Sequence, residues 1–123
     1  MENKLDAMSL MNDQMKAVLK KSAELAGDAF VTDVGFDQMR ANYIKERAFW
    51  NEGGPAMAKT EDVSFDGPMG AFSARFYYPV QAEKLPVIEF IHGGGFVVGS
   101  PATHDRVCRI LADRTGAAVV SVD

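Results

Sequence analysis

Three consecutive glycines, Gly93, Gly94 and Gly95, follow His92 at the end of an apolar segment. Glycine loses more conformational freedom on folding than any other residue, so three together indicate that the backbone itself is needed here. Without a Cβ, backbone N–H groups can approach a ligand atom closely. Such groups serve two chemistries: they bind phosphate, or they stabilise the oxyanion that forms during acyl transfer.

A phosphate-binding loop needs further residues at fixed positions. A dinucleotide fingerprint that starts at Gly93 would need its last glycine at position 98, where the chain has Val98. A P-loop with its second glycine at Gly99 would need a lysine next, where the chain has Ser100. A phosphate- or nucleotide-binding α/β domain is therefore the second interpretation, and oxyanion stabilisation the first.

The glycines connect two segments that predict a βαβ unit. Residues 87–91 are nearly all apolar, which is typical of a parallel strand buried on both faces. Glu89 departs from that pattern, because a charge buried in such a strand needs a partner. Residues 117–122 form a second apolar run, so we expect a right-handed crossover. The glycine loop would then lie at the carboxyl end of the sheet, where open α/β sheets bind ligands.

The helix of this unit follows the glycine loop. We expect it to begin with Ser100 as N-cap and Pro101 at the first position, or nearer Thr103. Gly116 is expected to end it. Its buried stripe is expected to consist of Val107, Ile110 and Leu111. Cys108 lies beside this stripe, which favours buried packing over reactivity.

Two helices are expected before the sheet. Residues 8–26 carry methionine, valine and leucine at helical spacing, and Gly27 follows them. A second helix is expected over residues 35–50, with Asp33 as its cap. Its aromatic residues favour either core packing or an acyl pocket; they are Phe36, Tyr43, Phe49 and Trp50.

The hydrophobic period changes after this second helix. Residues 51–55 contain two glycines and a proline and predict a linker. Residues 63–78 then alternate apolar and polar side chains around a turn at 66–70. This pattern predicts an antiparallel hairpin with one face toward a core.

The residues from His92 to Asp105, the pair Cys108-Arg109 and the segment 119–123 together resemble the hormone-sensitive-lipase-like family of carboxylesterases and acetyl esterases. His-Gly-Gly-Gly is the oxyanion-hole motif of such α/β-hydrolases. The resemblance covers essentially the whole chain, but only the first part of a family member. It implies an α/β fold in which residues 1–55 form cap helices and a linker. Residues 56–123 would form the first strands and first helix of the catalytic sheet.

The same resemblance implies an activity and roles for four residues. The family hydrolyses carboxylic esters, here expected to carry short acyl chains, through a serine nucleophile and an acyl-enzyme, without metal or cofactor. Gly94 and Gly95 would donate to the oxyanion, Gly93 would shape the turn, and His92 would brace the loop rather than act as a base.

The catalytic triad of the family is not found in this sequence. None of the six serines lies in a Gly-x-Ser-x-Gly segment, and the two histidines, His92 and His104, precede any such position. We therefore expect the chain alone to be inactive, as an N-terminal fragment or truncated product. The alternative is a non-catalytic interaction protein derived from a truncated hydrolase.

The strand order of the family has a further implication. It would place residues 117–122 between the hairpin and residues 87–91, which would leave 87–91 as an exposed apolar edge. Such an edge invites pairing with another chain, so self-association through it is expected.

Composition excludes several other classes of protein. A net charge of −4 argues against nucleic-acid binding and against a polybasic membrane surface. The single cysteine rules out an internal disulfide. No apolar run has the length of a signal peptide core or a membrane span, so a cytoplasmic location is expected.

Overall fold

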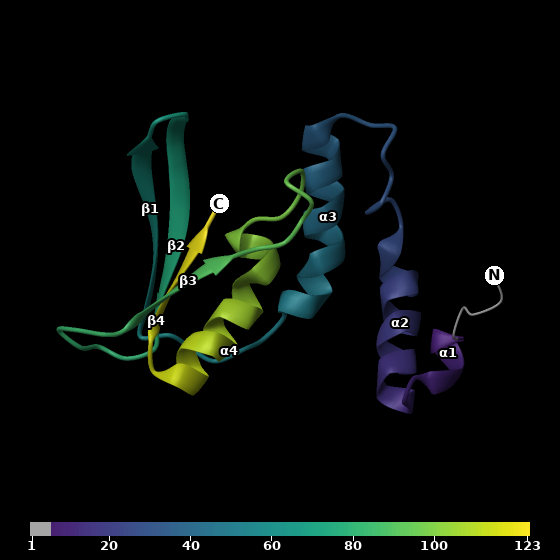
Figure 1. Cartoon of the computed structure of the whole chain (residues 1–123), viewed down its shortest axis with the longest axis horizontal. Helices are drawn as coiled ribbons and strands as arrows, with labels where there is room; N and C mark the ends of the chain where they lie inside the picture. The colour runs from purple at the N-terminus through teal and green to yellow at the C-terminus, as the bar shows by residue number, and fades with distance from the viewer. Residues whose placement is uncertain (1–5) are drawn as a thin grey trace.

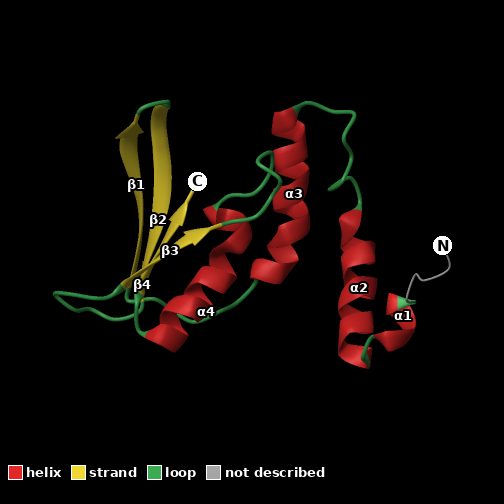
Figure 2. Cartoon of the chain, in the orientation of Figure 1, coloured by secondary structure: helices red, strands yellow, loops and turns green. Residues whose placement is uncertain are grey.

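The computed structural model describes residues 6–123; the first five residues, which the predicted region 1–55 includes, lie outside this part. Along the long axis of the molecule the sheet comes first, followed by α4, α3, α2 and α1 (Figures 1 and 2). The bounds of the elements, in chain order, are α1 Ala7–Leu10, α2 Asp13–Ala26, α3 Phe36–Asn51, β1 Lys59–Gly67, β2 Gly70–Tyr78, β3 Val87–Ile91, the 3-10 helix η1 Pro101–His104, α4 Asp105–Thr115 and β4 Ala118–Val122.

The four strands form one mixed sheet in the order β1-β2-β4-β3. β1 and β2 are the predicted antiparallel hairpin, and β2 also pairs antiparallel with β4. β3 and β4 are parallel and joined through η1 and α4, which confirms the βαβ connection. The expected strand order is therefore confirmed, and β3 lies at the edge of the sheet.

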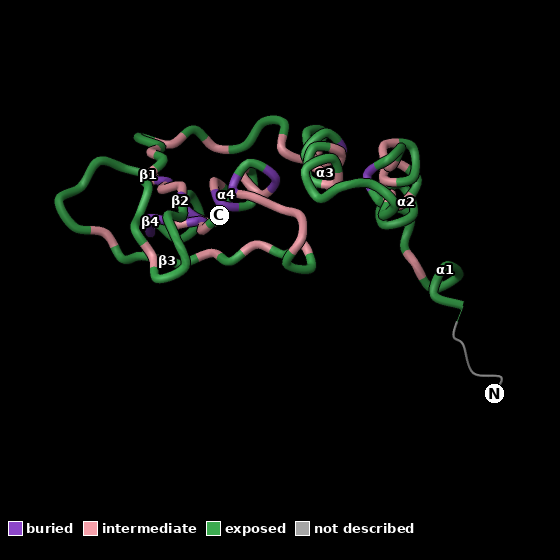
Figure 3. The backbone as a smooth tube through the Cα atoms, turned by 90° about the horizontal axis from the view of Figure 1, so that it is seen from above, coloured by how far each residue is buried: buried purple, intermediate pink, exposed green. Residues whose placement is uncertain are grey.

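Helix α4 covers one face of the sheet and makes the core. Cys108 and Ala112 of α4 pack with Tyr77 of β2 and Val119 of β4, and all four are fully buried. Figure 3 shows most of the buried backbone where α4 meets the sheet. The helix contributes small side chains to this core, and β2 contributes the large side chain of Tyr77.

The predicted buried stripe of α4 was partly wrong. Val107 is 50% exposed and Ile110 is 40% exposed, whereas Cys108 and Ala112 are completely buried. Cys108 and Ala112 are four residues apart and so lie on one helix face. Their small side chains let the helix approach the sheet closely, and only Leu111 of the predicted stripe packs against this core.

Strand β3 is partly buried on one face and exposed on the other, which corrects the expectation of burial on both. Ile88 and Phe90 pack toward α4, while Val87, Glu89 and Ile91 are exposed. No described helix covers the second face of the sheet at this edge (Figure 3). Glu89 therefore lies in solvent and needs no buried partner.

The expected helix over residues 8–26 is two helices. Asn12 interrupts it, because its Oδ1 accepts the N–H of Met15 at 2.8 Å and caps α2. The apolar side chains of this segment are largely exposed, among them Met8 and Met15.

Helix α3 matches its expected range within one residue, but its cap does not. Gly35, with an extended backbone, is the N-cap residue, so the prediction of Asp33 was wrong. α3 contacts η1 and α4 beside the sheet. Among residues 6–123, no helix is long and apolar enough to cross a bilayer.

Candidate functional site

The glycine loop, residues 92–100, leaves the carboxyl end of β3 and leads into η1. It borders a hollow of about 730 Å³. The rest of the lining comes from α3 and from the ends of two parallel strands: Arg40, Ile44, Ile91, Val122 and Asp123. Segments that are far apart in the sequence thus meet at the carboxyl end of the sheet, where a ligand site was predicted.

The backbone of the loop requires glycine at two positions. Gly94 has φ +147°, and a Cβ there would lie 1.6 Å from the carbonyl oxygen of Val98. Gly99 has φ +106°, and a Cβ there would lie 2.5 Å from Nδ1 of His92. Gly93 has no such constraint, since a Cβ there would have no heavy atom within 4 Å.

The loop closes on itself through two hydrogen bonds to one carbonyl. The N–H groups of Val97 and Val98 both donate to the carbonyl oxygen of Gly94, at 3.1 and 3.0 Å. No hydrogen bond with another described residue occupies the N–H of Gly94 or of Gly95. Both donors therefore remain free for a ligand beside the hollow, which the oxyanion prediction requires.

His92 and His104 flank the loop as a stacked pair of rings, with centroids 5.5 Å apart. Nδ1 of His92 lies 2.9 Å from the carbonyl oxygen of Gly93. Nδ1 of His104 lies 2.9 Å from Oγ1 of Thr103. Burial, followed by the nearby charges of His92 and Arg47, holds the pKa of His104 below its ordinary value. The ring of His92 thus lies between the backbone of the loop and the ring of His104.

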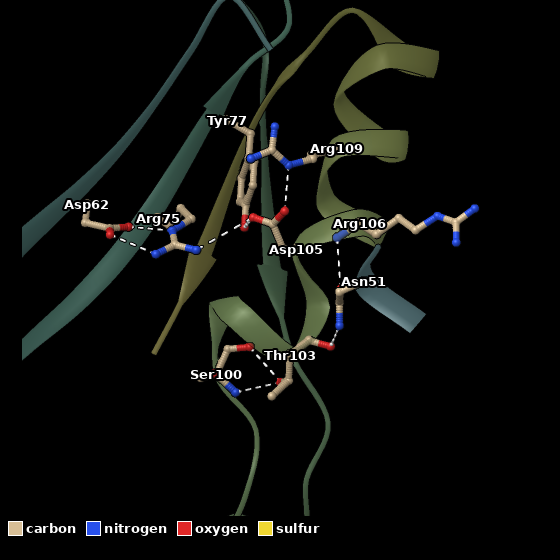
Figure 4. Close-up of polar contacts among 9 residues, drawn as sticks. All are labelled: Asn51, Asp62, Arg75, Tyr77, Ser100, Thr103, Asp105, Arg106 and Arg109. Atoms are coloured by element: carbon tan, nitrogen blue, oxygen red, sulfur yellow. Dashed lines mark hydrogen bonds and ion pairs between the residues drawn. The ribbon is translucent and has the colours of Figure 1, made fainter. Parts of the chain in front are cut away.

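Both predicted starts of the following helix, at Pro101 and near Thr103, lie in the helical segment that follows the loop. A 3-10 turn begins at Pro101, and the α-helix begins only at Asp105. Thr103 organises this turn: its Oγ1 accepts the N–H of Ser100 at 2.9 Å (Figure 4). Ser100 stands at the predicted N-cap, and its carbonyl oxygen accepts the N–H of Thr103 at 3.1 Å and the hydroxyl of Thr103 at 2.8 Å.

A polar network fixes the N-terminus of α4 on strand β2 (Figure 4). Asp105 accepts hydrogen bonds from the hydroxyl of Tyr77 at 2.9 Å and from Nε of Arg109 at 2.6 Å. Nη1 of Arg75 lies 3.6 Å from Oδ1 of Asp105, and the same guanidinium makes two hydrogen bonds to Asp62 on β1. This pairing with Arg75 lowers the pKa of Asp62, and burial raises the pKa of Tyr77.

The aromatic residues suggested for an acyl pocket do not line the hollow. They are Phe36, Tyr43, Phe49 and Trp50. The same helix instead contributes Arg40 and Ile44, which are four residues apart and share a face. The spacing of four residues could have predicted that Arg40 and Ile44 share a face of the helix. It could not indicate which face meets the loop. Among residues 6–123, no group of three His, Cys, Asp or Glu side chains could hold a metal ion.

Comparison with known proteins gives consistent relatives. Residues 88–123 match the family model described as alpha/beta hydrolase fold. An acetyl esterase of Salmonella agona is 34% identical over 122 residues, which is 99% of this chain and 37% of that protein. The chain thus spans little more than a third of the length of this relative.

Solved structures agree in fold. A hyperthermophilic esterase from the archaeon Pyrobaculum calidifontis superposes with a TM-score of 0.78 and 35% identity, over 92% of this chain and 36% of that one. The thermostable carboxylesterase EstE1 from a metagenomic library gives a TM-score of 0.68 and 36% identity, over 73% and 31%. Motif, fold and relatives agree: the chain has part of the α/β-hydrolase fold and is similar to the N-terminal part of the hormone-sensitive-lipase-like esterases.

Proposed function

We propose that this chain supplies the oxyanion hole of a serine carboxylesterase acting on esters with short acyl chains. The observation that carries the proposal is the pair of free N–H groups at Gly94 and Gly95, beside a hollow at the carboxyl end of the sheet. Residues 1–55 would act as cap and linker, and residues 56–123 as the first part of the catalytic sheet.

The chemistry assigned to the chain is stabilisation of charge. A serine oxygen attacks the ester carbonyl carbon, and the carbonyl electron pair moves onto oxygen. The amides of Gly94 and Gly95 donate to that oxyanion, with Gly93 shaping the turn and His92 bracing it. Collapse of the tetrahedral species expels the alcohol, and water then hydrolyses the acyl-enzyme.

The nucleophile is not among the serines of this chain, since none lies in a Gly-x-Ser-x-Gly segment. The 123-residue chain alone should therefore not hydrolyse esters. Serine-inhibitor-sensitive turnover of p-nitrophenyl acetate by the purified chain would contradict this part of the proposal.

A chimera tests the oxyanion role directly. Joining this chain to the remaining part of the Salmonella agona acetyl esterase, in place of the matched segment, should restore hydrolysis of p-nitrophenyl acetate. In that chimera, Gly94→Ala keeps the backbone N–H, but its Cβ would clash with the carbonyl oxygen of Val98 and displace the amide. We expect kcat to fall by about 100- to 1,000-fold, the cost of losing one oxyanion donor. Met69→Ala, in the exposed turn of the hairpin, is the control. Full activity of the Gly94→Ala chimera would refute the assignment.

We also propose that the chain self-associates through β3. Among residues 6–123 this strand pairs only with β4, and its Val87 and Ile91 are 65% and 78% exposed. An unpaired apolar edge offers free N–H and C=O groups to a second strand. An unpaired edge of this kind would also suit a non-catalytic interaction protein. The oligomeric state of the chain in solution tests the proposed self-association.

A further inference from the structure

One side chain of the N-terminal helices reaches the glycine loop. Nε of Arg40, on α3, donates to the carbonyl oxygen of Val97 at 2.9 Å, across 57 positions of the chain. The same guanidinium is held from its own helix, since Nη1 lies 3.4 Å from Oδ1 of Asp37 one turn earlier. The Arg40 side chain is 51% exposed, and the two contacts together direct its guanidinium toward the loop.

A contact at Val97 can control the geometry of the loop. Its own N–H donates to the carbonyl oxygen of Gly94, so Val97 closes the turn that carries the two free amides. The neighbouring Phe96 has φ +60° and a fully exposed side chain, so the tip of the loop packs against nothing. Among the described residues, the bond from Arg40 is the only hydrogen bond that reaches positions 93–99 from another helix or strand.

The other end of α3 holds the segment after the loop. Nδ2 of Asn51 donates to the carbonyl oxygen of Thr103 at 2.8 Å, and its Oδ1 accepts the N–H of Arg106 at 3.0 Å (Figure 4). Helix α3 thus contacts the chain within the glycine loop, at Val97, and directly after it, at Thr103 and Arg106. A shift in the position of α3 would therefore change the geometry of the turn.

We propose that Arg40 is a positioning residue for the oxyanion amides: through Val97 it keeps the turn in the form that leaves Gly94 and Gly95 N–H free. The role in catalysis rests on the proposed function, whereas the control of loop geometry does not. Any ligand that contacts Arg40 and Ile44 in the hollow would, by the same contact, act on the loop.

Amide NMR and hydrogen exchange on the 123-residue chain test this without any ester. Arg40→Met should shift the amide signals of residues 93–98 and speed the exchange of the hydrogen-bonded amides of Val97 and Val98 by about 2- to 12-fold, as loss of one hydrogen bond predicts. Arg40→Lys keeps a charged donor and should retain part of the native signal pattern. Lys45→Met, at an exposed position on the same helix that makes no hydrogen bond or ion pair with the described residues, is the control and should leave these amides unchanged.

Each result decides the proposal. Unchanged shifts and exchange at 93–98 in Arg40→Met would overturn it. Equal acceleration of the amides of β4 would also overturn it, because Arg40 would then act on overall stability and not on the loop. If Arg40→Met loosens the turn but the Gly94→Ala chimera keeps full activity, the positioning contact stands and the oxyanion function fails.

Discussion

The hydroxyl of Tyr77, on β2, donates a 2.9 Å hydrogen bond to the carboxylate of Asp105, the first residue of α4. Tyr77 is completely buried, so its hydroxyl has little access to water as a substitute partner. The bond fixes the start of α4 on the sheet, directly after the turn that ends the glycine loop. Asp105 also lies in the first helical turn, where a negative charge is favourable.

Asp105→Ala is expected to destabilise the chain by about 2 kcal/mol, because it leaves the Tyr77 hydroxyl buried without a partner. Asp113→Ala on the same helix is the matched control: Asp113 lies 3.9 Å from Arg114 in an exposed pair, and its loss should cost less than about 0.5 kcal/mol. Urea unfolding followed by circular dichroism measures both. Equal losses would show that the network around Asp105 contributes nothing specific.

Gly94→Ala is expected to destabilise the chain by about 2 kcal/mol or more, because φ of +147° and the carbonyl of Val98 both exclude a side chain. Gly93→Ala has open space and should change stability by less than about 0.5 kcal/mol. Chemical denaturation compares the two variants. A similar effect at both positions would mean that the turn at Gly94 is not held as the structure has it.

Stability is expected to fall at mildly acidic pH because of His104. Its pKa lies below the ordinary value near 6.5, mainly through burial, and it faces the ring of His92 and Oγ1 of Thr103. The unfolded chain then binds the proton more readily, so the free energy of unfolding decreases as pH drops below 6.5 toward the folded pKa. Above that range, His104 has no effect. His104→Gln should reduce the loss of stability between pH 8 and pH 5.5, and an unchanged pH profile would contradict this.

Cys108 is expected to be almost unreactive in the folded chain. Burial raises its pKa to about 11, so little thiolate exists at pH 8, and the side chain is completely buried. Labelling by a thiol reagent should be ~100-fold or more slower than for a free cysteine. Unfolding in urea should restore ordinary labelling. Rapid modification under native conditions would place Cys108 outside the core.

The sequence was most informative where backbone chemistry is local. Alternation and the glycine-rich turn predicted the hairpin, and the run of glycines predicted the loop at the end of β3. The bounds of β3 were predicted without error, but its burial was not. The second face of an edge strand depends on what packs there, which the five residues of β3 do not encode.

Failures came from packing and from distant contacts. The buried face of α4 was sought among large apolar residues, whereas close approach to the sheet favoured Cys108 and Ala112. Because apolar residues recur at helical spacing on both sides of Asn12, its role as a helix cap was not predicted. The bond from Arg40 to Val97 joins residues 57 positions apart, and no local pattern reports such a contact.

Self-association through β3 should respond to one charge at its edge. Ile91 is 78% exposed and belongs to the uncovered face of the strand, so Ile91→Lys should oppose pairing with a second strand. Met69→Lys introduces the same charge at a 99% exposed position in the hairpin turn, and should leave association unchanged. Light scattering over a range of concentrations should show oligomers for the unmodified chain and for Met69→Lys, and a shift toward monomer for Ile91→Lys. A monomeric unmodified chain at high concentration would refute the edge interaction. Oligomers that persist in Ile91→Lys would assign them to another surface.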